Sequence, residues 1–450
     1  MAESLFVSVS GLRGVVGASL TPAVAARYAR AFAATLPPGA VVVGRDGREH
    51  GPALVAAVVE ELRGAGRDVL DCGIAPTPTV GIVVREHRAA GGIQVTASHN
   101  PPRYNGMKLF SAAGRVLTGA AGAAVRDSFE AEPRAAEPTA TRGGAIVVDG
   151  TTAHVAAVLA TVDVAAIRRR APRVWIDCCH GAGSRVALPL LAALGCHVEV
   201  EGGVPDGHFS HPPEPIRVNL EPLLARVAAA GVDVGFFLDP DADRLVIVDG
   251  AGGWLGEEAT LALAVDTVLR RSPGPVVVNC ATSSVTAAIA ARHGVACHLT
   301  AVGEANVVDG MRAVEAIIGG EGNGGVIDPR VVLVRDAAVA MALILGRLAE
   351  GATVAELAAT LPKLAMLKET VDLPAGAAAL AEAEARLVDA FPEATGSRRD
   401  GLRLDWDGGW LLVRASNTEP IVRLAAEAPT PAAAEAAIAR ARRAIAGVRG

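Results

Sequence analysis

The chain has 450 residues, of which 51% are hydrophobic, and a formal net charge of −6 at neutral pH. This length predicts about two to four domains, each able to bury an apolar core. The negative charge and an aromatic content of 3% argue against a nucleic-acid-binding protein, which needs a basic surface and rings for base stacking. Because no apolar run approaches ~20 residues and no secretory leader is visible, we expect no membrane partner and a cytoplasmic location.

The cysteines do not show the spacing of a metal site or of a disulfide framework. None is part of a C-x-x-C pair, and two of them are adjacent within an apolar strand pattern. We therefore expect buried free thiols in a reducing compartment. The cysteines are Cys72, Cys178, Cys179, Cys196, Cys280 and Cys297.

Apolar strands alternate with helices along much of the chain. A helix that Thr21 caps is followed by strands at residues 41–43 and 69–74, with another helix between them. The same alternation resumes at residues 173–177 and again in a third unit. It predicts α/β units with parallel sheets, whose ligands bind at the carboxyl ends of strands. Residues 131–144, rich in Pro, Ala, Arg and Glu, are a predicted surface segment near the first boundary.

The first candidate site follows the short apolar strand at residues 93–95. The chain there runs into Thr96-Ala97-Ser98-His99-Asn100 and two prolines, which cannot continue a helix or a central strand. We expect a rigid exposed turn that displays the Ser98 hydroxyl, with His99 beside it as a donor for an anion. Lys108, one of only three lysines, can carry a point charge or exchange a proton. For Ser98 taken alone, an ordinary turn is the better interpretation.

Arg13 stands in a second glycine-rich turn, close to the N-terminus, within the run Ser10-Gly11-Leu12-Arg13-Gly14. A guanidinium held in such a loop can bind a phosphate or a sugar hydroxyl in a forked geometry. Taken alone, this pattern is better explained by a plain turn.

Three carboxylates, Asp239, Asp241 and Asp243, follow the strand predicted at residues 232–238. A proline after Asp239 breaks the strand, so that the three side chains can converge on one hard cation. Ligands that are all oxygen favour Mg²⁺ over zinc or copper. The twelve-residue pattern of an EF-hand is absent. Since clustered carboxylates repel one another unless a cation or Arg244 compensates, we predict a cation site.

A glycine-rich stretch from residue 319 to residue 325 surrounds Glu321 and Asn323. Such a loop allows the backbone to approach a ligand closely, with Glu321 accepting hydrogen bonds from hydroxyls. A flexible loop tip explains the glycines equally well. The sequence contains no G-x-x-x-x-G-K-[ST] motif, which argues against a P-loop nucleotide site.

The segment from residue 361 to residue 376 is a predicted linker to a last unit. A strand in that unit delivers Arg414, and Arg423 follows after a turn. Between these arginines stand Ser416, Asn417 and Thr418. Two forked cations with hydroxyl, amide and backbone donors between them are suited to a phosphate dianion. A capped turn is the weaker interpretation here.

These features need one chemistry that uses a serine, a cation site and a remote phosphate clamp together. Acyl transfer would require a separate histidine and a nucleophile elbow, and His99 is adjacent to Ser98 rather than separate. Phosphoryl transfer fits better, because a metal ion and nearby cations offset the charge of the moving group while the clamp orients the substrate.

The chain resembles the α-D-phosphohexomutases, the superfamily of phosphoglucomutases, phosphomannomutases and phosphoglucosamine mutases. Residues 96–101 resemble its phosphoserine loop, 239–244 its metal loop, 320–324 its sugar loop and 414–420 its phosphate loop. The resemblance spans the chain and implies an α/β fold of three similar α/β domains and a smaller C-terminal α+β domain around a central cleft. We expect these four domains at residues 1–148, 149–250, 251–364 and 365–450.

The resemblance also implies a mechanism, in which phospho-Ser98 gives its phosphoryl group to a hexose phosphate. The hexose 1,6-bisphosphate that results reorients and returns its other phosphate to Ser98, and the same compound primes the enzyme. Mg²⁺ would be held by the Ser98 phosphate with Asp239, Asp241 and Asp243. Arg13, His99, Lys108 and Arg244 would neutralise charge or move the hydroxyl proton. The sugar and its second phosphate would be bound by Glu321, Asn323, Arg414, Ser416, Asn417, Thr418 and Arg423.

The chain differs from many relatives at positions that are expected to determine the substrate. Many relatives carry Ser and His in the sugar loop, where this chain has Asn323 and Gly325. The run from Val302 to Asn306, with Glu304 in its middle, resembles the acidic loop of phosphoglucosamine mutases. The resemblance therefore favours conversion of glucosamine 6-phosphate to glucosamine 1-phosphate, with phosphomannomutase or phosphoglucomutase activity as the alternative.

Two more distant interpretations stay open. Residues 236–241 also fit the start of a haloacid-dehalogenase-type phosphatase with Asp239 as nucleophile, although the only downstream lysines are Lys363 and Lys368, within the predicted linker. A non-catalytic sugar-phosphate sensor would be expected to lose Ser98 or a metal carboxylate, and both are present. The oligomeric state is left open, with a homodimer among the partners considered.

Overall fold

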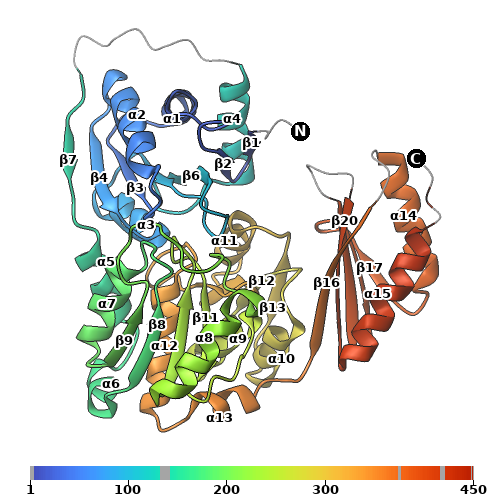
Figure 1. The fold of residues 1–450 in the computed structure, drawn as a ribbon. Helices are drawn as coiled ribbons and strands as arrows, with labels where there is room; N and C mark the ends of the chain where they lie inside the picture. Colours follow the sequence, from blue (N-terminus) through green and yellow to red (C-terminus); the bar gives the residue numbers. More distant parts are fainter. Residues whose placement is uncertain (1–4, 132–141, 373–376, 416–420, 447, 449–450) are drawn as a thin grey trace.

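The computed structural model describes residues 5–131, 142–372, 377–415, 421–446 and 448. It contains four β-sheets that follow one another along the chain, each with its own helices (Figure 1). Strands and helices alternate in the first three units, and the fourth has a meandering sheet covered by two helices. The predicted architecture of three α/β units and a C-terminal α+β unit is therefore confirmed. These are units I to IV below.

Unit I contains a seven-stranded sheet in the order β1-β2-β6-β5-β3-β4-β7. Its first helix begins where the sequence predicts, because the Thr21 hydroxyl accepts from the Val24 N–H and Pro22 occupies the first turn. The strands are β1 (Phe6–Ser8), β2 (Gly11–Val15), β3 (Val41–Arg45), β4 (Val69–Ile74), β5 (Gly91–Val95), β6 (Tyr104–Ser111) and β7 (Ala145–Val147). The helices are α1 (Pro22–Thr35), α2 (Gly51–Gly64), α3 (Thr77–Glu86) and α4 (Gly119–Glu130).

Units II and III each contain a four-stranded sheet, in the orders β11-β10-β8-β9 and β13-β12-β14-β15. Unit II consists of α5 (Thr151–Leu159), α6 (Val164–Arg170), β8 (Arg173–Asp177), α7 (Ser184–Ala193), β9 (His197–Glu201), α8 (Arg217–Ala230), β10 (Val234–Leu238) and β11 (Leu245–Asp249). Unit III consists of α9 (Glu257–Leu269), β12 (Val276–Asn279), α10 (Ser284–Arg292), β13 (Cys297–Thr300), α11 (Glu304–Ala313), β14 (Ile318–Glu321), β15 (Gly325–Ile327), α12 (Ala337–Ala349) and α13 (Val354–Ala359).

In each of these three units one parallel strand turns straight back through a short loop. β5 pairs antiparallel with β6, β10 with β11, and β14 with β15. The prediction of parallel sheets is therefore wrong at these pairs, as it is at β1–β2 and β2–β6 of unit I. A hairpin needs only a few turn residues, whereas a parallel return needs a crossover of a dozen or more. The three hairpin loops are the predicted phosphoserine, metal and sugar loops. Equivalent positions in three units thus supply the candidate site.

Unit IV is an antiparallel sheet in the order β16-β20-β19-β18-β17, with both of its helices on one face (Figure 1). Its elements are β16 (Ala365–Asp372), α14 (Ala377–Ala390), β17 (Thr395–Ser397), β18 (Leu402–Trp406), β19 (Gly409–Ala415), β20 (Ile421–Ala428) and α15 (Pro431–Ile445). The prediction of a linker over residues 361–376 is wrong for β16, which pairs with β20 along its whole length. This edge strand is only half-buried, so its apolar pattern is weak.

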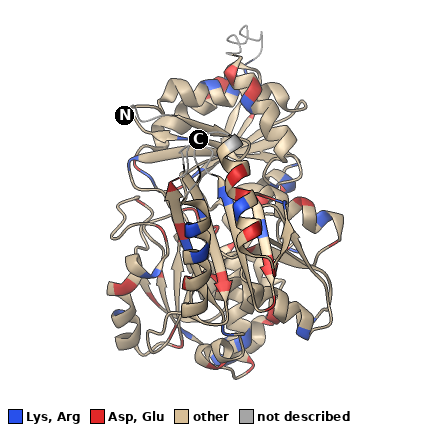
Figure 2. Cartoon of the chain, turned by 90° about the vertical axis from the view of Figure 1, so that its right-hand side faces the viewer, with Lys and Arg blue, Asp and Glu red and all other residues tan. Residues whose placement is uncertain are grey.

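Figure 2 shows acidic and basic residues of both signs mixed over the side of the molecule that it presents. The six cysteines are free thiols, three of them buried and three half-buried, as expected from their spacing. Among the described residues, no single helix is long and apolar enough to span a bilayer. One bent pair, α5 with α6 at 88°, passes only when the two helices are counted together.

Candidate active site

Ser98 lies in the hairpin loop after β5, with its backbone at a φ of 49° and its side chain buried. The expectation of an exposed hydroxyl is therefore wrong: only 1% of the residue is accessible, because the loop packs against unit II. The Ser98 Oγ donates a hydrogen bond to Asp239 Oδ2 at 2.7 Å and lies 3.3 Å from His99 Nδ1. The predicted serine and the predicted metal loop are thus in direct contact.

A buried arginine, Arg48, which no motif in the sequence marks, holds the backbone of the serine loop. Arg48, 2% exposed, donates to four backbone carbonyls of the loop at 2.6–2.9 Å. Asp46 accepts from Arg48 Nε at 3.1 Å and from the Thr96 hydroxyl at 2.7 Å. This network fixes the strained turn at Ser98, whose positive φ costs energy in a residue other than glycine.

The three aspartates of the metal loop are fully buried and face one another. One carboxylate oxygen from each of Asp239, Asp241 and Asp243 lies within 4.8 Å of the others. The Oδ1 atoms of Asp241 and Asp243 have no hydrogen-bond partner among the described residues. Burial, and then repulsion by the other two aspartates, raises the pKa of Asp239 well above its ordinary value. Unpartnered oxygens in a repelling cluster fit a hard divalent cation.

Lys108 projects from β6 into this cluster. Its Nζ lies 2.6 Å from Asp241 Oδ2 and 2.7 Å from Asp243 Oδ2. Burial acts to lower the pKa of Lys108, but the attraction of these two carboxylates outweighs it and raises the pKa above its ordinary value. Lys108 is therefore a fixed positive charge at neutral pH and is poorly suited to accept a proton.

His99 is neutral at the same pH. Burial, and then the charges of Arg244 and Arg13, lower the pKa of its imidazole to about 3. A neutral ring cannot offset phosphate charge, but it can accept or donate a proton at Nδ1, which faces the Ser98 hydroxyl. Arg13 itself donates to Asn100 Oδ1 at 3.1 Å, so it borders the serine loop.

Arg244 closes the metal loop with a guanidinium that is only partly engaged. Its Nε is 3.8 Å from Asp243 Oδ1 and is buried without a hydrogen-bond partner among the described residues. A buried guanidinium N–H without an acceptor is costly, which favours an anionic oxygen at this position.

The sugar loop contributes Glu321, a residue that is 5% exposed. Its Oε1 accepts from Asn279 Nδ2 at 2.7 Å and from the Gly303 N–H at 3.0 Å. Its Oε2 accepts from Arg335 Nη1 at 2.8 Å, and the Asn323 Oδ1 is 3.5 Å from the same nitrogen. Hydrogen bonds from the end of β12, from the turn after β13 and from Arg335 thus fix the Glu321 carboxylate.

Arg335 joins the metal loop to the sugar loop, although no motif in the sequence marks it. Besides Glu321 it donates to Asp243 Oδ2 at 2.5 Å, and its Nε lies 3.4 Å from Glu304 Oε2. Its backbone N–H also donates to Glu304 Oε1 at 2.9 Å. In the sequence, only its position shortly before the apolar helix α12 distinguishes it. A buried arginine shared by three carboxylates is a rigid connector.

The phosphate loop is only partly described. Ser416, Asn417 and Thr418 lie outside the described residues. Arg414 and Arg423 face each other across the β19–β20 ladder, as expected for arginines that bracket a turn. Arg414 Nη2 is 2.8 Å from Asp400 Oδ2, and the same oxygen accepts from the Val302 N–H at 3.0 Å. Arg414 is therefore connected through Asp400 to the loop that holds Glu321, and neither it nor Arg423 bonds to Ser98 within the described part of the chain.

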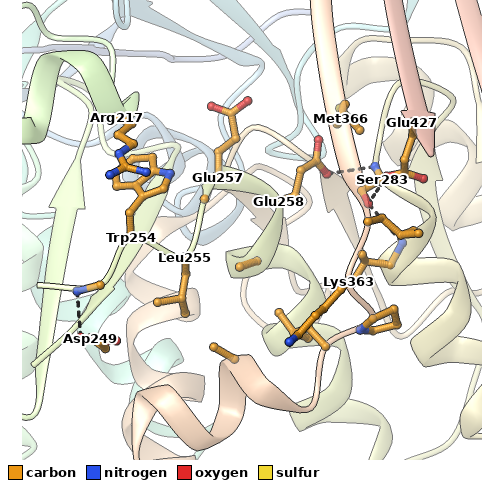
Figure 3. Close-up of a pocket in the computed structure, with 18 of the residues that line it drawn as sticks. Arg217, Asp249, Trp254, Leu255, Glu257, Glu258, Ser283, Lys363, Met366 and Glu427 are labelled. Carbon is orange, nitrogen blue, oxygen red and sulfur yellow. Dashed lines mark hydrogen bonds between the residues drawn. The ribbon is translucent and has the colours of Figure 1, made fainter. Parts of the chain in front are cut away.

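A cleft of about 740 Å³ lies beside the start of α9, between the turn after β11 and the chain entering unit IV. Figure 3 shows Glu257 and Glu258 on the wall of the cleft. The Glu258 carboxylate accepts from the Ser283 N–H, and the Ser283 hydroxyl donates to Glu427 of unit IV. Both lysines other than Lys108 line it, whereas the predicted catalytic and metal residues do not. The cleft therefore marks the attachment of unit IV rather than the candidate site.

Comparison with known proteins agrees with this arrangement. Family models described as phosphoglucomutase/phosphomannomutase, alpha/beta/alpha domains I, II and III, match residues 6–136, 152–253 and 257–364. The model of the C-terminal domain of the same family matches residues 377–445. The four matches follow one another in the order of units I to IV.

Individual proteins are similar over nearly the whole chain. A protein of Thermococcus kodakarensis named phosphoglucomutase/phosphomannomutase is 38% identical over 433 residues, covering 93% of each chain. A protein of Methanopyrus kandleri named "Probable phosphoglucosamine mutase" is 35% identical and covers 94% of each. The crystal structure of a phosphoglucomutase/phosphomannomutase family protein from Burkholderia thailandensis superposes with a TM-score of 0.85 at 28% identity, covering 99% of both chains. The chain therefore belongs to the phosphoglucomutase/phosphomannomutase family.

Proposed function

We propose that the chain is a mutase that interconverts hexose 6-phosphate and hexose 1-phosphate through phospho-Ser98 and a 1,6-bisphosphate. One observation carries the proposal: the Ser98 hydroxyl donates to Asp239 at the edge of a buried cluster of three carboxylates. A neutral serine hydroxyl cannot offset the charge of three carboxylates. The cluster would instead hold Mg²⁺ next to a phosphoserine. The metal ion would supply charge neutralisation to the moving phosphoryl group.

In the forward half-reaction a sugar hydroxyl attacks phospho-Ser98. The new bond joins the sugar oxygen to phosphorus and the bond from phosphorus to Ser98 Oγ breaks. The sugar hydroxyl loses its proton and Ser98 Oγ takes one up, so no net proton is released. His99 is the uncharged group beside the Ser98 hydroxyl, so it is the proposed proton carrier, and the negative phosphoryl group would raise its lowered pKa. Lys108 and Arg244 are proposed to stabilise the charge on the phosphoryl oxygens. After the bisphosphate reorients, the same steps run in reverse with the other phosphate. Hexose 1,6-bisphosphate is the proposed primer that first loads Ser98.

The remaining predicted residues bind rather than react. Glu321 and Asn323 belong to the sugar loop and are proposed to bind sugar hydroxyls. Arg13 borders the serine loop and is proposed to contact the phosphoryl group. Arg414 and Arg423, with the residues between them, are proposed to hold the phosphate that is not transferred, which restricts the sugar to two orientations.

For the substrate we propose glucosamine phosphate, with mannose or glucose phosphate as the alternative. Two findings support glucosamine: the acidic residue Glu304 stands beside the sugar loop, and several similar proteins carry the name phosphoglucosamine mutase. The 38% identical protein carries the other name, which supports the alternative. The domain boundaries given above, a cytoplasmic location and a homodimer stay predictions.

The test is ³¹P NMR of the purified protein with Mg²⁺ and a trace of hexose 1,6-bisphosphate. Glucosamine, mannose and glucose 6-phosphates are offered in turn. A growing 1-phosphate signal identifies both the reaction and the sugar. Release of inorganic phosphate alone would instead support the phosphatase with Asp239 as nucleophile, and no change with any sugar would support the sugar-phosphate sensor.

A further inference from the structure

His154 is a fully buried histidine that the proposed reaction does not use. It stands on α5 of unit II, with both ring nitrogens engaged. Its Nδ1 lies 2.8 Å from the hydroxyl of Thr79, on α3 of unit I. Its Nε2 lies 2.8 Å from Asp336 Oδ2, at the start of α12 of unit III. One imidazole therefore bonds to two other units at the point where all three meet.

The bond to Thr79 reaches the helix that holds Asp241. Thr77, the first residue of α3, donates from its hydroxyl to Asp241 Oδ2 at 2.5 Å and from its backbone N–H to the Asp241 carbonyl at 2.9 Å. Thr79 is two residues further along the same first turn. A shift of this turn would therefore move the side chain and the backbone of Asp241 together.

The bond to Asp336 reaches the helix that holds the other end of the metal loop. Asp336 caps α12 by accepting from the Ala338 N–H at 2.9 Å, and the Ala337 N–H donates to the carbonyl of Ala242 at 3.2 Å. Arg335, directly before the cap, donates to Asp243 Oδ2. The start of α12 thus sets the position of Asp243.

We propose that His154 is a positioning residue that fixes the spacing between Asp241 and Asp243 by tying α3 to α12. The Nε2–H donates to the Asp336 carboxylate, so Nδ1 accepts from the Thr79 hydroxyl, an assignment made from the hydrogen-bond partners. Buried hydrogen bonds of this kind keep the two helix ends in place against the mutual repulsion of Asp241 and Asp243, which Thr77 and Arg335 contact. The inference rests on the proposed metal site and adds a residue that touches neither metal nor substrate.

The test is calorimetric titration of the full-length protein with Mg²⁺ alone, without sugar phosphate. Thr79→Val keeps the side-chain volume but removes the hydroxyl, so it cuts the link between α3 and His154 and leaves Asp336 paired. Losing one buried hydrogen bond should weaken Mg²⁺ binding by about five- to tenfold. Thr79→Ser, which restores the hydroxyl, should bind as the wild type does.

A matched control separates positioning from stability. Thr267 is equally buried, and its hydroxyl donates only to the Leu263 carbonyl of its own helix at 2.7 Å. Thr267→Val should lower the melting temperature about as much as Thr79→Val without changing the Mg²⁺ affinity. His154→Gln keeps a donor toward Asp336 but cannot reach Thr79. Combined with Thr79→Val it should weaken binding no more than either change alone, since both remove one link.

The outcomes separate the inference from the proposal on which it rests. Unchanged Mg²⁺ affinity in Thr79→Val, with a melting temperature lowered as in Thr267→Val, would show a purely structural role and overturn the inference alone. Failure of the wild-type protein to bind Mg²⁺ would overturn the metal site, and the inference with it. Weaker binding in Thr79→Val with recovery in Thr79→Ser supports it.

Discussion

The junction of units I, II and III differs from the attachment of unit IV in what holds it together. One apolar cluster is continuous from β3 of unit I through β8 of unit II to α12 of unit III. Unit IV has a separate core of its own. Among the residues that the structure describes, a small buried cluster of Cys280, Trp410 and Leu412 bridges units III and IV, beside polar contacts such as the one between Ser283 and Glu427.

This difference separates two tasks. Ser98, the three aspartates, Lys108 and Arg335 are all fixed by the continuous core and its buried hydrogen bonds, as preorganised charge stabilisation requires. Arg414, which is proposed to hold the second phosphate, stands on unit IV, and a small, partly polar attachment of this kind can shift without opening either core. We therefore expect the proposed phosphoryl transfer to take place on the part of the molecule with a continuous core, and unit IV to adjust its position when substrate binds.

The largest expected effect is that of Ser98→Ala, within the rigid part. Phosphoryl transfer should fall by at least ~10⁴-fold, since no other group can carry the phosphate. Because the Ser98 hydroxyl is buried and bonded to Asp239, the change should also alter stability by about 1–3 kcal/mol. Transfer is followed by ³¹P NMR and stability by thermal unfolding. Ser184→Ala, at another buried serine, is the control, and normal turnover of Ser98→Ala would remove the phosphoserine role.

Arg335→Met comes next, because it disconnects the metal loop from the sugar loop. Three buried carboxylates lose their shared cation, which should destabilise the fold by about 3–5 kcal/mol and lower kcat about a hundredfold. Arg347, a buried arginine on the adjoining helix α12, pairs with Asp266 at 2.8 Å and supplies the matched change. Arg347→Met should cost similar stability and keep kcat. Equal losses of kcat in both variants would mean that Arg335 acts only on the fold.

The sequence predicted the candidate site well where chemistry is written in a short stretch of chain. Ser98, Asp239 to Asp243 and Glu321 each stand at the end of an apolar strand beside proline or glycine, and the structure brings these loops together. The sequence does not show that the next strand returns antiparallel. A strand buried on both faces is a continuous apolar run whether its neighbour is parallel or antiparallel.

The rest could not be predicted, because it consists of contacts between distant segments. Arg48, Arg335 and His154 are single residues without a local motif, and their roles depend on partners that lie up to 182 positions away. The burial of Ser98 has the same origin, since unit II covers a turn that looks exposed on its own. The sequence predicts a linker where β16 lies, because a half-buried edge strand has few apolar side chains to reveal it.

Glu427→Gln tests the weaker attachment and should have a smaller effect. The Glu427 carboxylate accepts from the Ser283 hydroxyl, from the Ser284 N–H at 2.9 Å and from Trp410 Nε1 at 2.8 Å (Figure 3 shows Ser283 and Glu427). An amide would place an N–H against one of these donors, weakening the attachment by about 1–2 kcal/mol. We expect KM to rise several-fold with kcat unchanged, and faster hydrogen exchange in α10. The exposed Glu435→Gln is the control. A fall in kcat at constant KM would contradict the division of tasks.

Glu258→Gln should leave activity unchanged and alter only how stability depends on pH. Burial raises the pKa of Glu258 to about 8 from an ordinary value of 4.5, and its Oε2 accepts from the Ser283 N–H at 3.0 Å. Because the folded state holds this proton more tightly than the unfolded chain does, its stabilising contribution is complete below about pH 4.5 and is lost as pH rises toward 8. The slope from this group is at most about 1.4 kcal/mol per pH unit.

Urea unfolding from pH 5 to pH 9 measures this slope. Glu258→Gln keeps the acceptor for Ser283 but cannot ionise, so its stability curve should be flatter than that of the wild type over this range. Glu257→Gln, next to it but less buried, should keep the wild-type slope while losing the 2.8 Å contact with Lys368. Parallel curves for Glu258→Gln and the wild type would show that the carboxyl is ionised in the fold. The boundary with unit IV would then tolerate a buried charge as readily as the junction of units I, II and III does. The contrast between the two regions would rest on apolar packing alone.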